Sequence, residues 1–484
     1  MNIISRKTML HSKPHLITPE RGYTFMRLPL NSLIYDLPDD ILKSKLAGDF
    51  EGTLRKINAR LQKENITPML RDRLTVEKGL IERLEIRYPY TKAQAIEYGN
   101  TRIMNLTEEE FDAFEDAGDI DFIYVNGEKK YLSSCIGALI KMHPHLHARQ
   151  VKEEDRVKDP TDKIARAEMR KNGELAYKFT MKRSIQVKDK CFIPNAVYTA
   201  HLPIPAASAQ QDAAKIEILA DADAFIPPVD EYQRAVCYKR FLSENKPFEV
   251  TYTFENRVKF VDPFKDTPHI VYPNAIPPCE DDLSEQVPQI TFTPYLKELA
   301  KLIAGDETRK LYLAKRVYDY VTQNVRYSFM RSYILVENHP EFTAINQKGD
   351  CGMQAILFIT LCRILGIPAR WQSGRTVEKD DSGCHDWAQF YTEEFGWLFA
   401  DPSYGGGGWR NGDLECWSFY FGNLDPFRMI ANRRYYTPFN PPKKHEYYDP
   451  YDSQDGEIEC EERGFDTYDF IDDGEVLAYA KVEE

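Results

Sequence analysis

Two stretches decide the fold: GDCGMQAILFITLCRILGIPARWQSG at residues 349–374 and HDWAQFYTEEFGWLFADPSYG at residues 385–405. In the first, Cys351–Leu365 is apolar almost all round, which predicts a buried helix that Gly366 and Pro368 terminate. Three runs rich in β-branched and aromatic residues follow, and each predicts a strand: Ala369–Val377, Asp386–Thr392 and Trp397–Asp401. A buried helix followed by an antiparallel sheet is typical of an α+β domain.

Three residues that could take part in catalysis lie at the ends of these elements. Cys351 opens the helix, where the positive end of the helix dipole and unpaired N–H groups lower a thiol pKa and favour the thiolate. His385 begins a strand and could hold that thiolate and protonate a leaving group. Asp401 ends the next strand, where a carboxylate could orient the imidazole. The residues alone also allow a packing cysteine, a surface histidine and a turn-forming aspartate before Pro402.

The register of the two strands decides whether His385 and Asp401 meet. If the loop Thr392–Glu394 joins antiparallel strands, His385 faces Asp401 directly on one side of the sheet. A slip of one residue would put the two side chains on opposite faces. Gly396 could also host the turn, so the register stays a hypothesis.

These stretches resemble the core of the transglutaminase-like superfamily, which shares the papain-like arrangement of cysteine enzymes. The resemblance covers roughly residues 306–404 and rests on the G-x-C helix start, the R-x-L-G-I-P-A-R run, the H-x-W strand and the GW…DPS strand end. It implies a papain-like catalytic core in which Cys351 is the nucleophile, His385 the base and Asp401 the orienting carboxylate. The strands and helices before this core resemble those of bacterial members.

The sequence departs from the family pattern at two points. Gln389 stands where many members have the glutamate of H-x-W-x-E, and all five tryptophans follow Cys351, whereas animal transglutaminases use an upstream tryptophan to steady the oxyanion. We expect the backbone N–H of Cys351 to supply one oxyanion donor. Three residues are candidates for the other donor from their position: Gln323, Asn324 and Tyr327.

The resemblance implies a cysteine hydrolase that cleaves an amide or peptide bond through an acyl-enzyme intermediate. One alternative is a protein-glutamine acyltransferase (a transglutaminase), in which an amine such as lysine accepts the acyl group. Another is a scaffold that binds a peptide or partner without turnover, which Gln389 and the unmatched N-terminal region favour slightly. The expected partner is a peptide or protein amide substrate, with no cofactor and no metal ion. The oligomeric state is left open.

Composition shifts divide the chain into four segments. We expect a mainly helical domain over 1–175, an antiparallel β-sandwich with a proline-rich connector over 176–284, the catalytic core over 285–405, and an aromatic and acidic tail over 406–484 that wraps the core. Within them, the patterns predict helices at Asp39–Leu61 and, capped by Asp306, at Asp306–Val325; a hairpin at Asp121–Leu132; and a linker at Val151–Ala165.

Composition narrows the cellular context. The chain has 484 residues and a formal net charge of −13, which disfavours non-specific binding to nucleic acid or anionic membrane. No apolar run approaches the roughly 20 residues that cross a bilayer. The first 22 residues lack the apolar block of a signal peptide, so we expect a cytoplasmic protein. Nine scattered cysteines, with no CxxC pair, argue against a disulfide framework.

Overall fold

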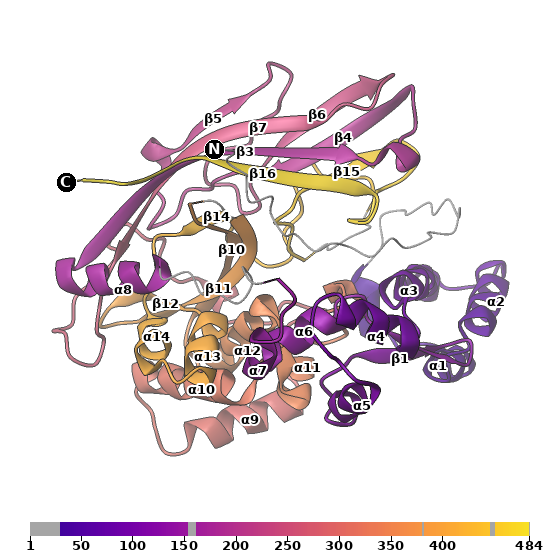
Figure 1. Ribbon diagram of the computed structural model, residues 1–484, viewed down its shortest axis with the longest axis horizontal. Helices are drawn as coiled ribbons and strands as arrows, with labels where there is room; N and C mark the ends of the chain where they lie inside the picture. Colours follow the sequence, from indigo (N-terminus) through magenta and orange to yellow (C-terminus); the bar gives the residue numbers. More distant parts are fainter. Residues whose placement is uncertain (1–29, 153–160, 380–381, 446–450, 484) are drawn as a thin grey trace.

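The computed structural model describes residues 30–152, 161–379, 382–445 and 451–483. Figure 1 shows a β-sandwich above a third sheet, with a layer of helices beneath that sheet. The mixed helices and antiparallel sheets confirm the predicted α+β class. No helix in this part of the chain is long and apolar enough to cross a membrane.

The third sheet carries the sequence stretches that decide the fold. Its strands follow the order β13-β12-β11-β10-β14, and all neighbours are antiparallel. Their bounds are Ala369–Val377 (β10), Ser382–Thr392 (β11), Gly396–Ala400 (β12), Phe421–Gly422 (β13) and Arg428–Asn432 (β14). The predicted buried helix is α12, Cys351–Ile364, which packs against the sheet through Phe358 and Phe390, with ring centroids 5.8 Å apart.

Other helices surround α12 beneath this sheet (Figure 1). They are α9 (Pro294–Ala304), α10 (Lys310–Asn324), α11 (His339–Asn346), α13 (Pro402–Arg410) and α14 (Leu414–Phe419), with the 3₁₀ turns η5 (Glu280–Asp282) and η6 (Tyr333–Leu335) and the two-residue strands β8 (Arg326–Tyr327) and β9 (Lys348–Gly349). The prediction that Asp306 caps α10 was wrong, because the helix begins at Lys310 and its N-cap is Arg309. The apolar stripe alone could not locate the first turn.

The sandwich is built from two antiparallel sheets of orders β15-β4-β6 and β16-β3-β7-β5. Their strands are β3 (Glu174–Val187), β4 (Ala196–Pro203), β5 (Glu217–Ala220), β6 (Ala235–Leu242), β7 (Phe248–Lys259), β15 (Glu457–Cys460) and β16 (Phe470–Lys481), with the 3₁₀ turns η3 (Asp189–Cys191) and η4 (Ala213–Lys215). Strands β15 and β16 come from the segment 406–484, so the end of the chain contributes to both sheets.

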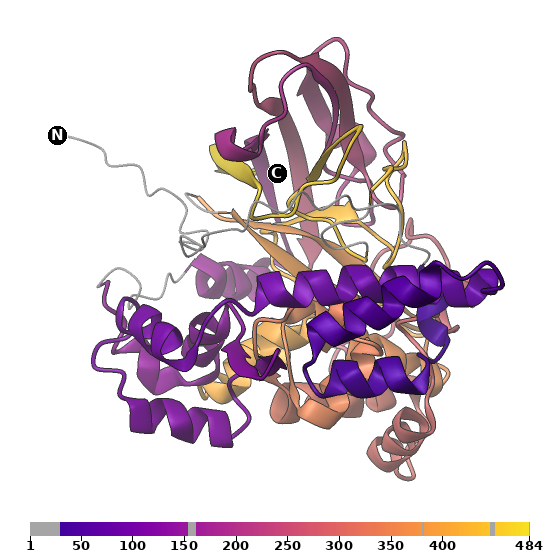
Figure 2. The same cartoon turned by 90° about the vertical axis from the view of Figure 1, so that its right-hand side faces the viewer.

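The described part of the N-terminal region is mainly helical. Its elements are η1 (Leu30–Ile34), α1 (Asp39–Leu46), α2 (Phe50–Leu61), α3 (Pro68–Arg87), α4 (Lys92–Asn100), α5 (Glu108–Asp116), α6 (Cys135–Met142), α7 (Pro144–His147) and α8 (Thr161–Asn172). The hairpin is confirmed: β1 (Phe122–Val125) pairs with β2 (Glu128–Tyr131) across Asn126-Gly127. Figure 2 shows these helices beside the helical layer of the core.

Two predictions for this region, the helix at Asp39–Leu61 and the linker at Val151–Ala165, differ from the structure or lie partly outside the described residues. The single helix expected at Asp39–Leu61 is two helices, because the chain turns at Gly48, whose φ of 72° favours glycine. Of the linker expected at Val151–Ala165, residues 153–160 lie outside the described residues. Its last part belongs to α8, which begins at Thr161.

Candidate active site

Cys351 is the first residue of α12, and the local chain brings other groups close to it. Asp350 is the N-cap, and its Oδ1 accepts a hydrogen bond of 3.1 Å from the Met353 N–H. A Cβ atom at Gly352 would lie 2.2 Å from the hydroxyl oxygen of Tyr333 and 2.8 Å from Oδ2 of Asp386. Only glycine permits this approach, so the residue after Cys351 is dictated by packing.

The thiol of Cys351 is half-buried and bonded to a carboxyl group that sequence reasoning did not single out. Its Sγ donates to Oδ2 of Asp386 over 3.3 Å. Burial raises the pKa of the thiol well above 9.0, and the charges of Asp386 and Asp350 raise it further. The helix dipole was predicted to lower this pKa; in this arrangement burial and the two carboxylates outweigh it.

Asp386 belongs to a buried acidic cluster. Its Oδ1 accepts a hydrogen bond from the side-chain amide of Gln454. Burial raises its pKa well above 3.8, and the nearby charges of Asp452 and Asp350 act in the same direction. The only sequence signal for Asp386 was its place in HDW, directly after the predicted histidine.

His385 and Asp401 are in contact and buried. His385 Nε2 and Asp401 Oδ2 lie 2.7 Å apart, with 4% and 0% of the two residues exposed. Burial lowers the pKa of His385, although the charge of Asp401 opposes this effect. Burial alone would raise the pKa of Asp401, but His385 and Arg428 outweigh it and the pKa falls below 3.8. A carboxylate in this position can orient a protonated or neutral imidazole.

Further contacts hold Asp401 in place. Its Oδ1 accepts the N–H of Tyr404 over 2.9 Å and so caps α13. Its Oδ2 lies 3.3 Å from Nη2 of Arg428, which also pairs with Asp425 at 2.8 Å. Arg428 is fully buried and its guanidinium lies 4.2 Å from the ring centroid of Tyr404. The orienting carboxylate is therefore itself oriented by a buried arginine.

The observed register differs from the predicted one. Ala388 pairs with Ala400 and Thr392 with Gly396, so the turn lies at residues 393–395 and the pairing is shifted by two positions. A shift of two preserves the face on which each side chain points, because strand side chains alternate with a period of two. His385 and Asp401 therefore share one face although they are not direct cross-strand partners.

The thiol and the imidazole are not joined in this arrangement. Among the residues that the structure describes, no hydrogen bond links Cys351 with His385. His385 and Asp386 are consecutive on β11, so their side chains point to opposite faces of the strand. Cys351 contacts Asp386, which places His385 and Asp401 on the other side. The structure thus brings His385 and Asp401 together, whereas Cys351 contacts Asp386, the residue that follows His385 in the chain.

Of the three residues predicted as candidates for the second oxyanion donor, one lies near Cys351 and two are exposed. Tyr327 lies beside the thiol: burial raises the pKa of its hydroxyl, and the proximity of Cys351 adds to the effect. Gln323 and Asn324 are exposed on α10. Gln389 accepts a hydrogen bond of 2.7 Å from Nε of Arg370. Within the described ranges, no cluster of three His, Cys, Asp or Glu side chains could hold a metal ion.

Comparisons with known proteins bear on this site. The family model of the transglutaminase-like superfamily matches residues 297–402. A "putative cysteine protease" from Cytophaga hutchinsonii is 15% identical, with 63% of this chain and 91% of that chain covered and a TM-score of 0.38. The periplasmic domain of TgpA from Pseudomonas aeruginosa is 14% identical, with 52% and 96% covered and a TM-score of 0.27.

At these scores the structural likenesses add no argument, and no curated protein matched. The family match stands on its own, and the matched segment contains Cys351, His385 and Asp401. Residues 297–402 are therefore a transglutaminase-like domain.

Proposed function

We propose that this domain is a cysteine hydrolase that cleaves peptide or amide bonds, with Cys351 as the nucleophile. The observation that carries the proposal is the buried hydrogen bond of 2.7 Å between His385 and Asp401, one residue along β11 from the carboxyl group that holds the thiol. A histidine oriented in this way serves as a general base and acid. The positions match those that the family resemblance assigns.

The chemistry requires the thiol to change partner. Cys351 must leave Asp386 and reach the face of β11 that carries His385, and its proton then passes to the ring nitrogen of His385 that Asp401 does not occupy. The thiolate attacks the carbonyl carbon, and His385 returns the proton to the departing amine. Water, activated by the same imidazole, then hydrolyses the acyl-enzyme. The arrangement described above is accordingly a resting form, in which the raised pKa of the thiol keeps it neutral.

Hydrolysis of fluorescently labelled casein tests the proposal. We expect Cys351→Ala and His385→Ala to abolish cleavage. The matched control is Cys384→Ala, because Cys384 is an exposed cysteine next to His385 with no proposed role. Cleavage by Cys351→Ala at the wild-type rate would exclude Cys351 as the nucleophile.

A non-catalytic scaffold is a second candidate, and one observation favours it. The thiol is bonded to Asp386, its pKa is raised, and no hydrogen bond within the described ranges links it to His385. For a scaffold, alkylation of Cys351 by iodoacetamide is no faster than that of a model thiol and increases only well above pH 9.0. Alkylation that is faster than this at neutral pH, together with casein cleavage, favours the enzyme.

A further inference from the structure

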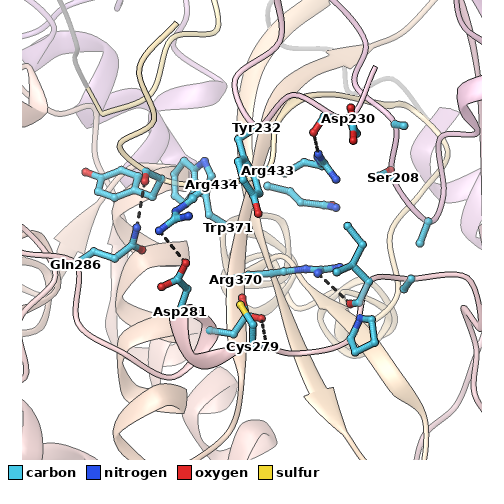
Figure 3. Close-up of a pocket in the computed structure, with 18 of the residues that line it drawn as sticks. Ser208, Asp230, Tyr232, Cys279, Asp281, Gln286, Arg370, Trp371, Arg433 and Arg434 are labelled. Carbon is cyan, nitrogen blue, oxygen red and sulfur yellow. Dashed lines mark hydrogen bonds and ion pairs between the residues drawn. The ribbon is translucent and has the colours of Figure 1, made fainter. Parts of the chain in front are cut away.

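A separate cavity of about 260 Å³ lies at one edge of the third sheet (Figure 3). Strand β14 pairs only with the second half of β10, from Ser373 onward, so in the described chain the first half of β10 has no partner on that edge. Arg370 and Trp371 of that uncovered half line the cavity. The segment that follows β14 and the loop before α9 close it.

Arginine is the dominant charged residue of this cavity. Its lining includes Arg363, Arg370, Arg433 and Arg434, and three aspartates, Asp230, Asp281 and Asp282. One aspartate is already used, because Asp281 pairs with Arg434 at 2.9 Å. Another, Asp282, accepts a hydrogen bond of 3.0 Å from the backbone N–H of Cys279. With four arginines and three aspartates, the lining carries one more positive than negative charge.

The other three arginines have only neutral hydrogen-bond partners among the described residues. Arg370 donates to Oε1 of Gln389 and to the carbonyl of Ile276. Arg433 donates to the backbone carbonyl of Asp230. Arg363 donates to the carbonyls of Ala369 and Ser284 and to the Gln286 side chain. No carboxylate in that part of the chain lies within ion-pair distance of any of the three.

Burying such charges is costly. Burial lowers the pKa of Arg363 and of Arg370 to about 10 each. A buried charge without an opposite charge destabilises a protein unless a counter-ion or ligand compensates it. Guanidinium groups are also well suited to pair with carboxylate and phosphate oxygens.

Two further donors lack partners at the same place. Nε1 of Trp371 is buried, with 2% of the residue exposed, and no acceptor among the described residues reaches it. The same holds for Nε of Arg433. Buried N–H groups are nearly always satisfied, so these two donors on lining residues show that the protein leaves hydrogen-bonding capacity unused next to the cavity.

We propose that this cavity is a binding site for a small organic oxyanion, a carboxylate or phosphate attached to a flat or apolar body. Arg370 and Arg433 receive the oxyanion. The aromatic rings of Tyr232, Trp371 and Tyr435 line the cavity and cover the body of the ligand. The volume is below the roughly 300–1,000 Å³ of pockets for drug-sized ligands, so the ligand is compact.

Three probes of similar size test the site in the full-length protein: phenyl phosphate, benzoate and uncharged benzyl alcohol. We expect isothermal titration calorimetry to detect binding of at least one of the two anions and not of the alcohol. The anion that binds more tightly distinguishes phosphate from carboxylate as the natural chemistry. Neither binding nor its failure involves Cys351, so the outcome is independent of the proposed hydrolase activity.

Two variants and a control locate the site. Arg433→Gln and Arg370→Gln should each weaken anion binding about tenfold or more, as expected for the loss of a charge-assisted hydrogen bond. Arg309→Gln is the control, because Arg309 is exposed and paired with Glu307 outside the cavity. Should Arg370→Gln fold poorly, Arg433→Gln alone decides. The proposal is wrong if neither anion binds, if benzyl alcohol binds equally well, or if Arg433→Gln binds like Arg309→Gln.

Discussion

Replacing Asp401 by asparagine isolates the charge that organises the His385 side of the site. Asparagine keeps the size of the side chain and can still cap α13 through its oxygen. It removes the charge that lies 2.7 Å from His385 Nε2 and 3.3 Å from Arg428 Nη2. Both partners are buried, so water cannot replace the lost interaction.

The expected loss in the free energy of unfolding follows from these contacts. A hydrogen bond to a charged group contributes about 1.5–3 kcal/mol, and breaking a buried pair costs about 3–5 kcal/mol when the remaining charge has no partner. Arg428 keeps Asp425 at 2.8 Å, which puts Asp401→Asn at the lower end, near 3 kcal/mol of unfolding free energy. Casein hydrolysis should also fall strongly, because the imidazole loses its orientation.

The effect has a defined pH dependence. The pKa of Asp401 is below 3.8 in the folded protein, so its charge stabilises the fold above that pH and loses its effect as the pH falls through the folded pKa. The difference between wild type and Asp401→Asn should therefore be constant near neutral pH, increase where His385 takes up a proton in the wild type but not in the variant, and shrink in strong acid as Asp401 itself is protonated. Removal of the carboxylate should also lower the pKa of His385 further.

Urea denaturation followed by circular dichroism measures the difference. The control is Asp473→Asn, an exposed aspartate on β16, which should change the unfolding free energy by no more than about 0.5 kcal/mol. A change for Asp401→Asn as small as the control would refute the reasoning, and so would a difference that does not shrink as the pH falls below 3.8.

Three other predictions concern the neighbourhood of the thiol. Gly352→Ala should destabilise the protein by about 1–3 kcal/mol in thermal unfolding, because its Cβ would lie 2.2 Å from the Tyr333 hydroxyl oxygen. The control is Gly407→Ala, which should stabilise α13 by about 0.5–1 kcal/mol because no atom lies within 4 Å of its Cβ position. Equal effects of the two substitutions would contradict the packing argument. Asp386→Asn should speed alkylation of Cys351 by iodoacetamide, because it removes a charge that raises the thiol pKa; an unchanged rate, measured by peptide mass spectrometry, would show that Asp386 does not control the thiol. For a hydrolase, wild-type protein should cleave casein without incorporating a fluorescent amine into it, whereas Cys351-dependent incorporation would indicate acyl transfer.

Local sequence patterns were sufficient where neighbours along the chain dictate the structure. The apolar run after Cys351 predicted α12 almost to the residue, and Asn126-Gly127 predicted the hairpin between β1 and β2. The run rich in β-branched and aromatic residues at Ala369–Val377 predicted β10 with the bounds that the structure has. In each case one short segment carries both the pattern and the structure.

The sequence patterns failed where the structure depends on contacts between segments that are far apart in the chain. The position of the turn between β11 and β12 depends on how the two strands pair, and the register is shifted by two from the predicted one. The raised pKa of Cys351 comes from burial and from Asp386, whose proximity no spacing along the chain announces. Likewise, β16 joins the sandwich by pairing with β3, nearly 300 residues earlier.

The amino-acid sequence alone indicated the transglutaminase-like segment that the family model matches at residues 297–402, the buried helix, and Cys351, His385 and Asp401 as candidate site residues, because these depend on side-chain types in local motifs. Tertiary structure alone decided which carboxyl group contacts the thiol and which arginines surround one cavity. The physical reason is that burial and pairing of charges are properties of the folded surroundings: the same aspartate or arginine is an ordinary solvated charge until segments far apart in the chain exclude water from it.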